Sequence, residues 1–179
     1  MSKNISRRRL LKSAAAAGVG LPMILPSGIL AGPSSNERLK FACIGMGGQM
    51  RGYLVPELGK IDQQIVAICD VDKRQRDSAL KAPGLTEART YHDYRELLDK
   101  ETEVDAVLIG TPDHWHVPIC QAALEAGKHV YCEKPLAHSV AECRALEKLA
   151  TSHPKLATQT GNQGCSTEGF RRSFEVIQS

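Results

Sequence analysis

Short apolar runs recur along the chain from about residue 40 onward. The clearest are Phe41–Ile44, Ile65–Cys69, Val104–Ile109 and Val130–Cys132, and weaker ones lie at Thr90–Tyr91 and Leu156–Thr158. Runs of this length that are apolar on both faces predict buried strands. Because both faces must then be covered, we expect helices in the segments between them.

The intervening segments show the spacing and the end signals of helices. Asp93 and Ser139 are suited to begin two of them, and Gly127 is suited to end another. The predicted helices cover Tyr94–Leu98, Val117–Ala126 and Val140–Ser152. Strands that alternate with helices in this way predict an α/β fold of the Rossmann type, a doubly wound parallel sheet with helices on both faces.

Length and composition allow one domain of ordinary size with a tail. The chain has 179 residues, of which 42% are hydrophobic and 24% are charged, and this balance excludes an intrinsically disordered protein. We divide it into a signal at 1–31, a polar linker at 32–37, a nucleotide-binding domain at 38–166 and the start of a connecting helix at 167–179.

The amino terminus is typical of an export signal. Ser6–Lys12 carries paired arginines and is followed by a weakly apolar stretch over residues 14–30. This order resembles a twin-arginine signal and predicts transfer of the folded protein by the twin-arginine machinery to a periplasmic or other extracytoplasmic location. Ala31 could end the signal, but Ile29 occupies a position where a small residue is preferred. Retention as an uncleaved membrane anchor therefore stays open.

Charge and cysteine spacing exclude other classes. Residues 1–31 hold five basic residues and no acid, which leaves 18 basic against 20 acidic residues in the remainder. A slightly acidic body does not favour nucleic-acid binding. The six cysteines include no C-x-x-C pair, and most lie in apolar or helical patterns, so we expect buried thiols rather than disulfides.

The first strand is followed by a glycine-rich loop. Gly45, Gly47 and Gly48 allow a tight turn, and with Gln49 and Met50 they are candidates to surround a pyrophosphate at a helix start. The strict G-x-G-x-x-G pattern fails because Met50 stands at its last position. The pattern instead runs on to Gly52, and Pro56 is expected to shorten or kink the helix.

The second strand ends at Asp70. A carboxylate at this place can accept hydrogen bonds from the ribose of NAD and would repel the 2′-phosphate of NADP. Arg74 is the counter-argument, because a guanidinium nearby can bind that phosphate. In the plainer alternative, Asp70 caps the next helix.

The fourth strand is followed by further candidates for cofactor binding, Thr111, Pro112, His114 and His116. Asp113 with the two histidines could also suggest a metal site. No second cluster supplies more ligands, and polar residues commonly begin helices, so we expect no metal.

The fifth strand leads into Glu133-Lys134-Pro135, and Gln163 follows the last strand. Glu133 and Gln163 are cofactor-binding candidates because they lie at the carboxyl edge of the predicted sheet. Lys134 is the catalytic candidate, since a lysine in the ligand crevice can bind a substrate oxygen or transfer a proton. A cis bond before Pro135 would direct Lys134 inward.

Two segments carry a family resemblance. Gly110–Pro118 and Glu125–Leu136, above all A-G-K-H-V-Y-C-E-K-P, resemble the glucose–fructose oxidoreductase/inositol dehydrogenase (Gfo/Idh/MocA) family, and the likeness covers residues 38–178. The resemblance implies a Rossmann domain of an NAD(P)-dependent oxidoreductase that acts on sugars or cyclic polyols. It also implies that Lys134 binds substrate and takes part in proton transfer. The cofactor would be surrounded by Asp70, Glu133, the Gly45 loop and the Thr111–His116 loop.

Family members carry a second α/β domain after this one. We therefore expect the chain to be a fragment that binds NAD, and NADP less well, without turnover, and that forms a homo-oligomer only together with that domain. Two other functions stay open. Some exported relatives are glycosidases that use tightly held NAD, and a non-catalytic cofactor-binding or assembly module is the third reading.

Overall fold

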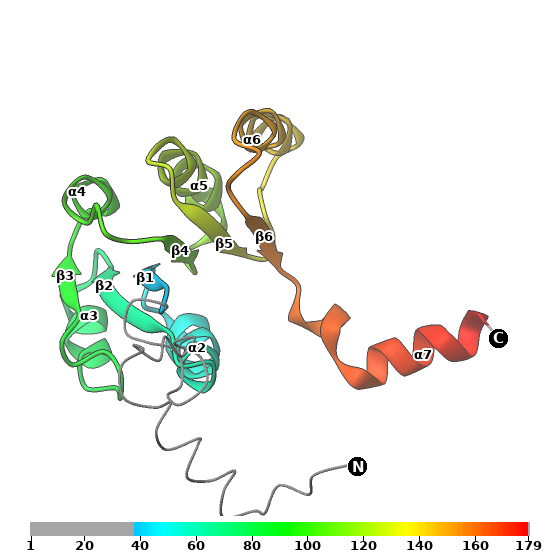
Figure 1. Cartoon of the computed structure of the whole chain (residues 1–179), viewed down its shortest axis with the longest axis horizontal. Coiled ribbons are helices and arrows are strands. Elements are labelled where there is room, and N and C mark those ends of the chain that lie inside the picture. The colour runs from blue at the N-terminus through cyan, green and yellow to red at the C-terminus, as the bar shows by residue number, and fades with distance from the viewer. Residues whose placement is uncertain (1–37, 179) are drawn as a thin grey trace, which may run out of the picture. The chain divides into compact units, whose positions relative to one another are not determined.

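The sheet has six parallel strands in the order β3-β2-β1-β4-β5-β6 (Figure 1). A computed structural model describes residues 38–178. The strands are β1 Lys40–Ile44, β2 Gln64–Cys69, β3 Arg89–Tyr91, β4 Ala106–Ile109, β5 His129–Glu133 and β6 Thr158–Gly161. The predicted signal at 1–31 and linker at 32–37 lie outside the described residues, so export stays a prediction.

Helices cover both faces of the sheet, with α2 and α3 on one face and α4, α5 and α6 on the other (Figure 1). The helical segments are the π-helical turn η1 Met50–Leu54, α2 Val55–Lys60, α3 Lys73–Ala79, α4 Tyr94–Lys100, η2 Asp113–Trp115, α5 His116–Glu125, α6 Val140–Ser152, η3 Gln163–Ser166 and α7 Glu168–Gln178. This arrangement confirms the predicted doubly wound fold.

Two apolar cores hold the layers together. One lies between the sheet and α4, α5 and α6, with Val107, Ile109 and Leu124 at its centre. The other lies under η1, α2 and α3, where Met50 and Ile68 are fully buried. The strand order reverses between β1 and β4, and ligands bind at this point in open α/β sheets. The carboxyl ends of β1 and β4 are therefore the expected place for a ligand.

The predicted helix ends are confirmed. The Asp93 side chain accepts a hydrogen bond from the N–H of Arg95, and Ser139 with Glu142 forms a reciprocal capping box on α6. Gly127 has φ +74°, the left-handed conformation expected just beyond a helix end. The last strand was predicted at Leu156–Thr158 but begins at Thr158, because its side chains are polar and gave no apolar signal.

The cysteine prediction is only partly correct. Cys43, Cys69, Cys120 and Cys132 are buried, but Cys143 and Cys165 are exposed, and all six thiols are free. Helical spacing placed Cys143 in α6 without indicating that it faces solvent. Burial raises the pKa of Cys43 to about 12, so this thiol stays protonated.

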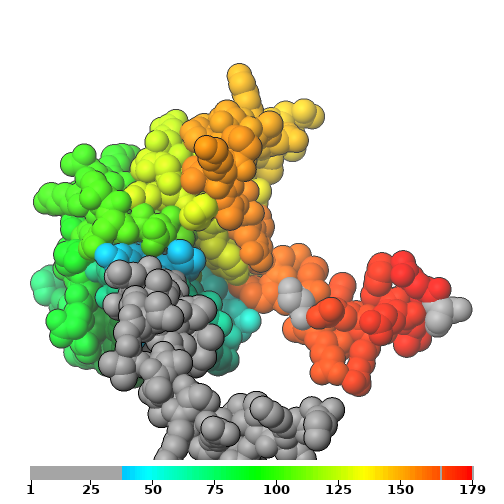
Figure 2. Space-filling view, viewed as in Figure 1, coloured from blue at the N-terminus to red at the C-terminus, as the bar shows by residue number. Residues whose placement is uncertain are grey.

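Helix α7 carries its apolar side chains outward. Phe170, Phe174 and Ile177 lie on one stripe and are exposed, and α7 buries none of its residues. In the space-filling view its orange-to-red surface stands apart from the sheet and its helices (Figure 2). No helix within residues 38–178 is long and apolar enough to cross a membrane.

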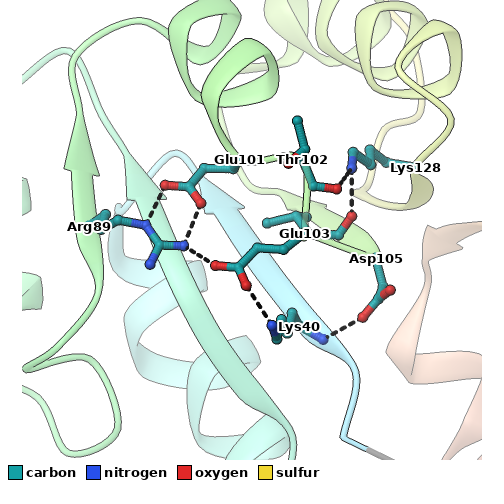
Figure 3. A network of polar contacts seen from close by, with 8 residues as sticks. Lys40, Arg89, Glu101, Thr102, Glu103, Asp105 and Lys128 are labelled. Carbon is teal, nitrogen blue, oxygen red and sulfur yellow. Dashed lines mark hydrogen bonds and ion pairs between the residues drawn. The ribbon is translucent and has the colours of Figure 1, made fainter. Parts of the chain in front are cut away.

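The amino edge of the sheet is held by a polar network (Figure 3). Arg89 at the start of β3 binds Glu101, whose carboxylate is buried, and also Glu103 at 2.6 Å. Lys40 at the start of β1 pairs with Glu103 at 2.5 Å. Lys128 is buried and donates to the carbonyl oxygens of Thr102 and Val104. The network therefore joins β1, β3 and the segments that enter β4 and β5.

The Arg89–Glu101 pair predicts a pH-dependent contribution to stability. Arg89 lowers the pKa of Glu101, so the pair stabilises the fold above the ordinary value of 4.5 and loses this effect as pH falls through the lowered pKa. Arg89→Met should reduce the free energy of unfolding at pH 7 by about 1–3 kcal/mol, because a buried carboxylate loses its cation while Arg89 itself is half exposed. Urea unfolding at pH 7 and at about pH 3 should show the difference from the unaltered protein shrinking in acid.

Lys73→Met is the matched control. Lys73 pairs with Asp77 on the exposed face of α3, so its loss should cost less than about 0.5 kcal/mol. An Arg89→Met effect of the same size at both pH values would contradict the assignment.

Candidate functional site

The glycine loop begins where β1 comes close to the end of β4. Gly45 has φ +86°, and a Cβ added there would lie 2.7 Å from the carbonyl carbon of Gly110 and from the nitrogen of Thr111. Its N–H also donates to the carbonyl of Cys69 at 2.8 Å. Only glycine fits, because both the conformation and the space exclude a side chain.

The rest of the loop opens toward solvent. A Cβ at Gly47 or Gly48 would meet no atom within 4 Å, so a ligand can approach the backbone there. Gln49 enters the helix and directs its amide toward Glu133 at 3.4 Å. Donor groups at a helix start suit an anionic group.

Met50 explains how the missing third glycine is accommodated. Its side chain is fully buried, and its Cε would lie 3.2 Å from a Cβ at Gly110. The small residue is therefore Gly110, directly after β4, and the large one lies in the helical turn, whereas in the usual pattern a glycine of the helix allows the close packing. The helix opens into a π-helical turn at Met50–Leu54 before α2, and Pro56 lies in the first turn of α2, where proline is tolerated.

Asp70 makes two hydrogen bonds with backbone N–H groups. Its Oδ2 accepts from Met46 at 2.7 Å, and its Oδ1 accepts from Asp72 at 2.8 Å. The plainer alternative for Asp70 is wrong, since Asp72 is the N-cap of α3 and accepts from the N–H of Arg74. The Arg74 side chain is 92% exposed and pairs with Asp72, whose pKa it lowers.

A pocket of about 390 Å³ lies between the glycine loop, Asp70 and the Thr111 loop. The sequence did not indicate the residues that line the pocket from the segment after β3 and the start of α4. The missed residues are Val71, His92, Asp93, Tyr94 and Arg95, whereas Trp115 belongs to the predicted Thr111–His116 loop. Tyr94 meets Trp115 edge to face at 6.2 Å, and the Arg95 guanidinium lies 4.6 Å from the Tyr94 ring centre. The available signal was the strand at Thr90–Tyr91, because ligand groups follow the carboxyl ends of parallel strands.

The loop after β4 divides into exposed and buried parts. Pro112 and His114 are exposed and line the pocket. His116 is buried, and its two ring nitrogens lie 2.8 Å from the Thr111 carbonyl oxygen and 2.6 Å from the Pro135 carbonyl oxygen. His116 therefore joins the Thr111 loop to the Lys134–Pro135 turn instead of lining the pocket.

Glu133 is a buried carboxylate held by neutral donors. Its Oε1 accepts from the Gln163 amide at 2.5 Å, and its Oε2 accepts from the N–H of Lys134 at 3.3 Å. The Tyr131 hydroxyl accepts from Gln163 at 2.7 Å, and burial, followed by the charge of Glu133, raises the Tyr131 pKa to about 12. A Cβ at Gly161 would lie 2.7 Å from that hydroxyl, so glycine leaves the room that this group needs.

Lys134 is exposed at the carboxyl edge and precedes a cis peptide bond to Pro135. It follows β5, whose final residue is the buried Glu133. The structure thus gathers the predicted residues in two groups. Gly45, Asp70, Thr111, Pro112 and His114 line the pocket, while Gln49 and Gln163 both donate to Glu133 and are not part of its lining.

The chemistry of the pocket fits a dinucleotide. Within residues 38–178, the buried Oγ1 of Thr111 lacks a hydrogen-bond partner, and it lies beside the open glycine loop. A ligand hydroxyl or phosphate could satisfy it, while Asp70 keeps accepting capacity for ribose. Among the same residues, no three His, Cys, Asp or Glu side chains converge as a metal site would require.

Comparison with known proteins agrees with this geometry. A family model described as "Oxidoreductase family, NAD-binding Rossmann fold" matches residues 39–160. The chain belongs to the Gfo/Idh/MocA oxidoreductase family.

Relatives within the Gfo/Idh/MocA family include dehydrogenases and glycosidases. The chain is 31% identical to inositol 2-dehydrogenase of Salmonella paratyphi B over 116 residues, covering 65% of this chain and 34% of the relative. It is 34% identical to a glycosyl hydrolase family 109 protein of Solibacter usitatus over 171 residues, covering 88% and 39%.

A solved structure shows the same fold. The myo-inositol 2-dehydrogenase from Lactobacillus plantarum superposes with a TM-score of 0.73 at 29% identity, covering 79% of this chain and 41% of that chain. The chain thus spans between 34 and 41% of the length of these relatives.

The contact between β1 and β4 predicts different effects at two neighbouring glycines. Gly45→Ala should lower the free energy of unfolding by about 2–5 kcal/mol, because the left-handed backbone and the 2.7 Å approach both resist a Cβ. Gly47→Ala should change it by less than about 1 kcal/mol, because its Cβ meets open space. Thermal and urea unfolding measure both, and equal effects of the two substitutions would refute this account.

Proposed function

We propose that this chain forms the NAD(H)-binding part of an oxidoreductase that acts on a sugar or cyclic polyol. The observation that carries the proposal is the pocket at the sheet's switch point, where Gly45, Asp70 and the Thr111 hydroxyl meet, the last without a hydrogen-bond partner among residues 38–178. The substrate class is supported by relatives named as inositol 2-dehydrogenases.

The pocket and the glycine loop that begins at its Gly45 have separate proposed roles. The open backbone at Gly47 and Gly48 binds the diphosphate, and Asp70 accepts hydrogen bonds from the ribose hydroxyls. Tyr94 and Trp115 offer apolar ring surface to the adenine. When bound, the nicotinamide group of the cofactor supplies the hydride acceptor.

The proposed role of Lys134 is to accept or stabilise the hydroxyl proton of the substrate. Oxidation of an alcohol requires its hydroxyl proton to leave as the hydride departs, and a nearby ammonium or amine can stabilise or accept it. Lys134 stands at the carboxyl edge on the turn that His116 joins to the Thr111 loop. Glu133 beneath it is already occupied by amide donors, so Lys134 is the side chain that is exposed to a substrate.

A glycosidase that uses NAD is the second candidate. The observation that favours it is the Solibacter usitatus relative, which matches 88% of this chain and is named as a glycosyl hydrolase family 109 protein. Net hydride transfer to free cofactor separates the two functions, because a cycle that returns the hydride to its substrate yields no free reduced cofactor.

The cofactor assignment predicts a preference. The 179-residue chain should bind NADH at least about tenfold more tightly than NADPH, because the Asp70 carboxylate repels a 2′-phosphate. Fluorescence titration measures both affinities. Arg74→Gln should leave them unchanged, because Arg74 is exposed and paired with Asp72. Tighter NADPH binding that disappears in Arg74→Gln would show that Arg74 governs the choice.

The catalytic assignment predicts a separation of turnover from binding. In a protein that joins this chain to the family's second domain, Lys134→Ala should lower turnover about 100-fold while NADH affinity stays unchanged. Lys155→Ala removes another exposed lysine, before β6 at the opposite edge, and should leave both quantities unchanged. Normal turnover with lost NADH affinity in Lys134→Ala would move Lys134 from catalysis to cofactor binding.

A further inference from the structure

Asp70 connects three parts of the carboxyl edge. Its side chain accepts the N–H of Met46, the second residue of the glycine loop, at 2.7 Å. Its own N–H donates to the carbonyl of Tyr91 at the end of β3, and its carbonyl accepts from the Arg76 guanidinium in α3. Because the backbone N–H and carbonyl of Asp70 are both hydrogen-bonded, its carboxylate is held in place and can restrain the glycine loop.

Met46 is the part of the loop that this contact orders. Its side chain is fully buried, so the residue is anchored on one side by the core and on the other by Asp70. The preceding residue, Gly45, is held by the Cys69 carbonyl and pressed against Gly110. The Asp70 hydrogen bond is therefore the last restraint before the open backbone of Gly47 and Gly48.

Asp70 also faces the pocket and keeps accepting capacity. Each of its oxygens binds one N–H group, whereas a carboxylate oxygen can accept two hydrogen bonds. The same side chain can thus bind a ligand hydroxyl and hold the loop at the same time.

We propose that Asp70 is a positioning residue for the phosphate-binding backbone as well as a ribose contact, so that one carboxylate couples the two halves of the nucleotide site. This inference rests on the proposed function. Removing the carboxylate then weakens binding even of a nucleotide that lacks the ribose hydroxyls. The direction is diagnostic, because loss of a negative charge near a diphosphate would by itself strengthen binding.

The test compares ADP with 2′,3′-dideoxy-ADP on the 179-residue chain and on two variants. Asp70→Ala, which leaves no side-chain acceptor, should weaken binding of both nucleotides, and that of dideoxy-ADP by about tenfold, the scale of a lost hydrogen bond to a charged group. Asp72→Asn is the matched control, because it removes the same charge two residues away and asparagine is an equally good N-cap. It should weaken binding of neither nucleotide, because loss of the charge alone acts in the opposite direction. If Asp70→Ala weakens only ADP, Asp70 is a ribose contact alone and the proposal is overturned.

Hydrogen exchange provides a readout that needs no ligand. The Met46 amide should exchange about tenfold faster in Asp70→Ala than in Asp72→Asn, while the amide of Val107 in β4 stays protected and reports an intact fold. Unchanged exchange at Met46 in Asp70→Ala overturns the positioning role, because alanine leaves no acceptor for that N–H. If the unaltered chain binds neither nucleotide, the proposed function fails, and the Met46 exchange rate alone decides whether Asp70 holds the loop.

Discussion

The close approach of β1 and β4 at their carboxyl ends is the constraint on which the rest of the site depends. At Gly45 the backbone of one strand leaves no room for a side chain against Gly110 and Thr111 of the other. This approach places the glycine loop beside the Thr111 loop and creates the pocket between them. It also explains why a helix residue as large as Met50 can lie over the end of β4, since Gly110 beneath it has no side chain.

The two edges of the sheet differ in how fully their buried polar groups are hydrogen-bonded. At the amino edge, the buried Glu101 carboxylate is paired with Arg89 and also accepts a hydrogen bond from the Tyr91 hydroxyl. At the carboxyl edge, the buried Thr111 hydroxyl has no hydrogen-bond partner within residues 38–178. Each carboxylate oxygen of Asp70 accepts only one of the two hydrogen bonds that it could accept. Unsatisfied polar groups cost free energy, so a protein tolerates them where a ligand completes them.

Much of this arrangement could be predicted from the sequence, because it follows from local patterns. Apolar runs located the strands, and capping residues such as Asp93 and Ser139 located helix ends. The rule that ligands lie at strand ends then selected Asp70 and Thr111. What could not be predicted depends on contacts between distant segments. The reciprocal fit of Met50 and Gly110 is of this kind, and so is the inward turn of His116 toward two carbonyl groups.

The amino-edge network affects which substitutions such a chain can accept during evolution. Arg89, Glu101, Lys40 and Lys128 join several strands at the edge opposite to the pocket (Figure 3). Substitutions in the ligand loops therefore leave these contacts in place, and the fold keeps a reserve against the destabilisation that new side chains usually bring. A scaffold built in this way can drift in its chemistry while its architecture persists, which accords with relatives named both as dehydrogenases and as glycosyl hydrolases.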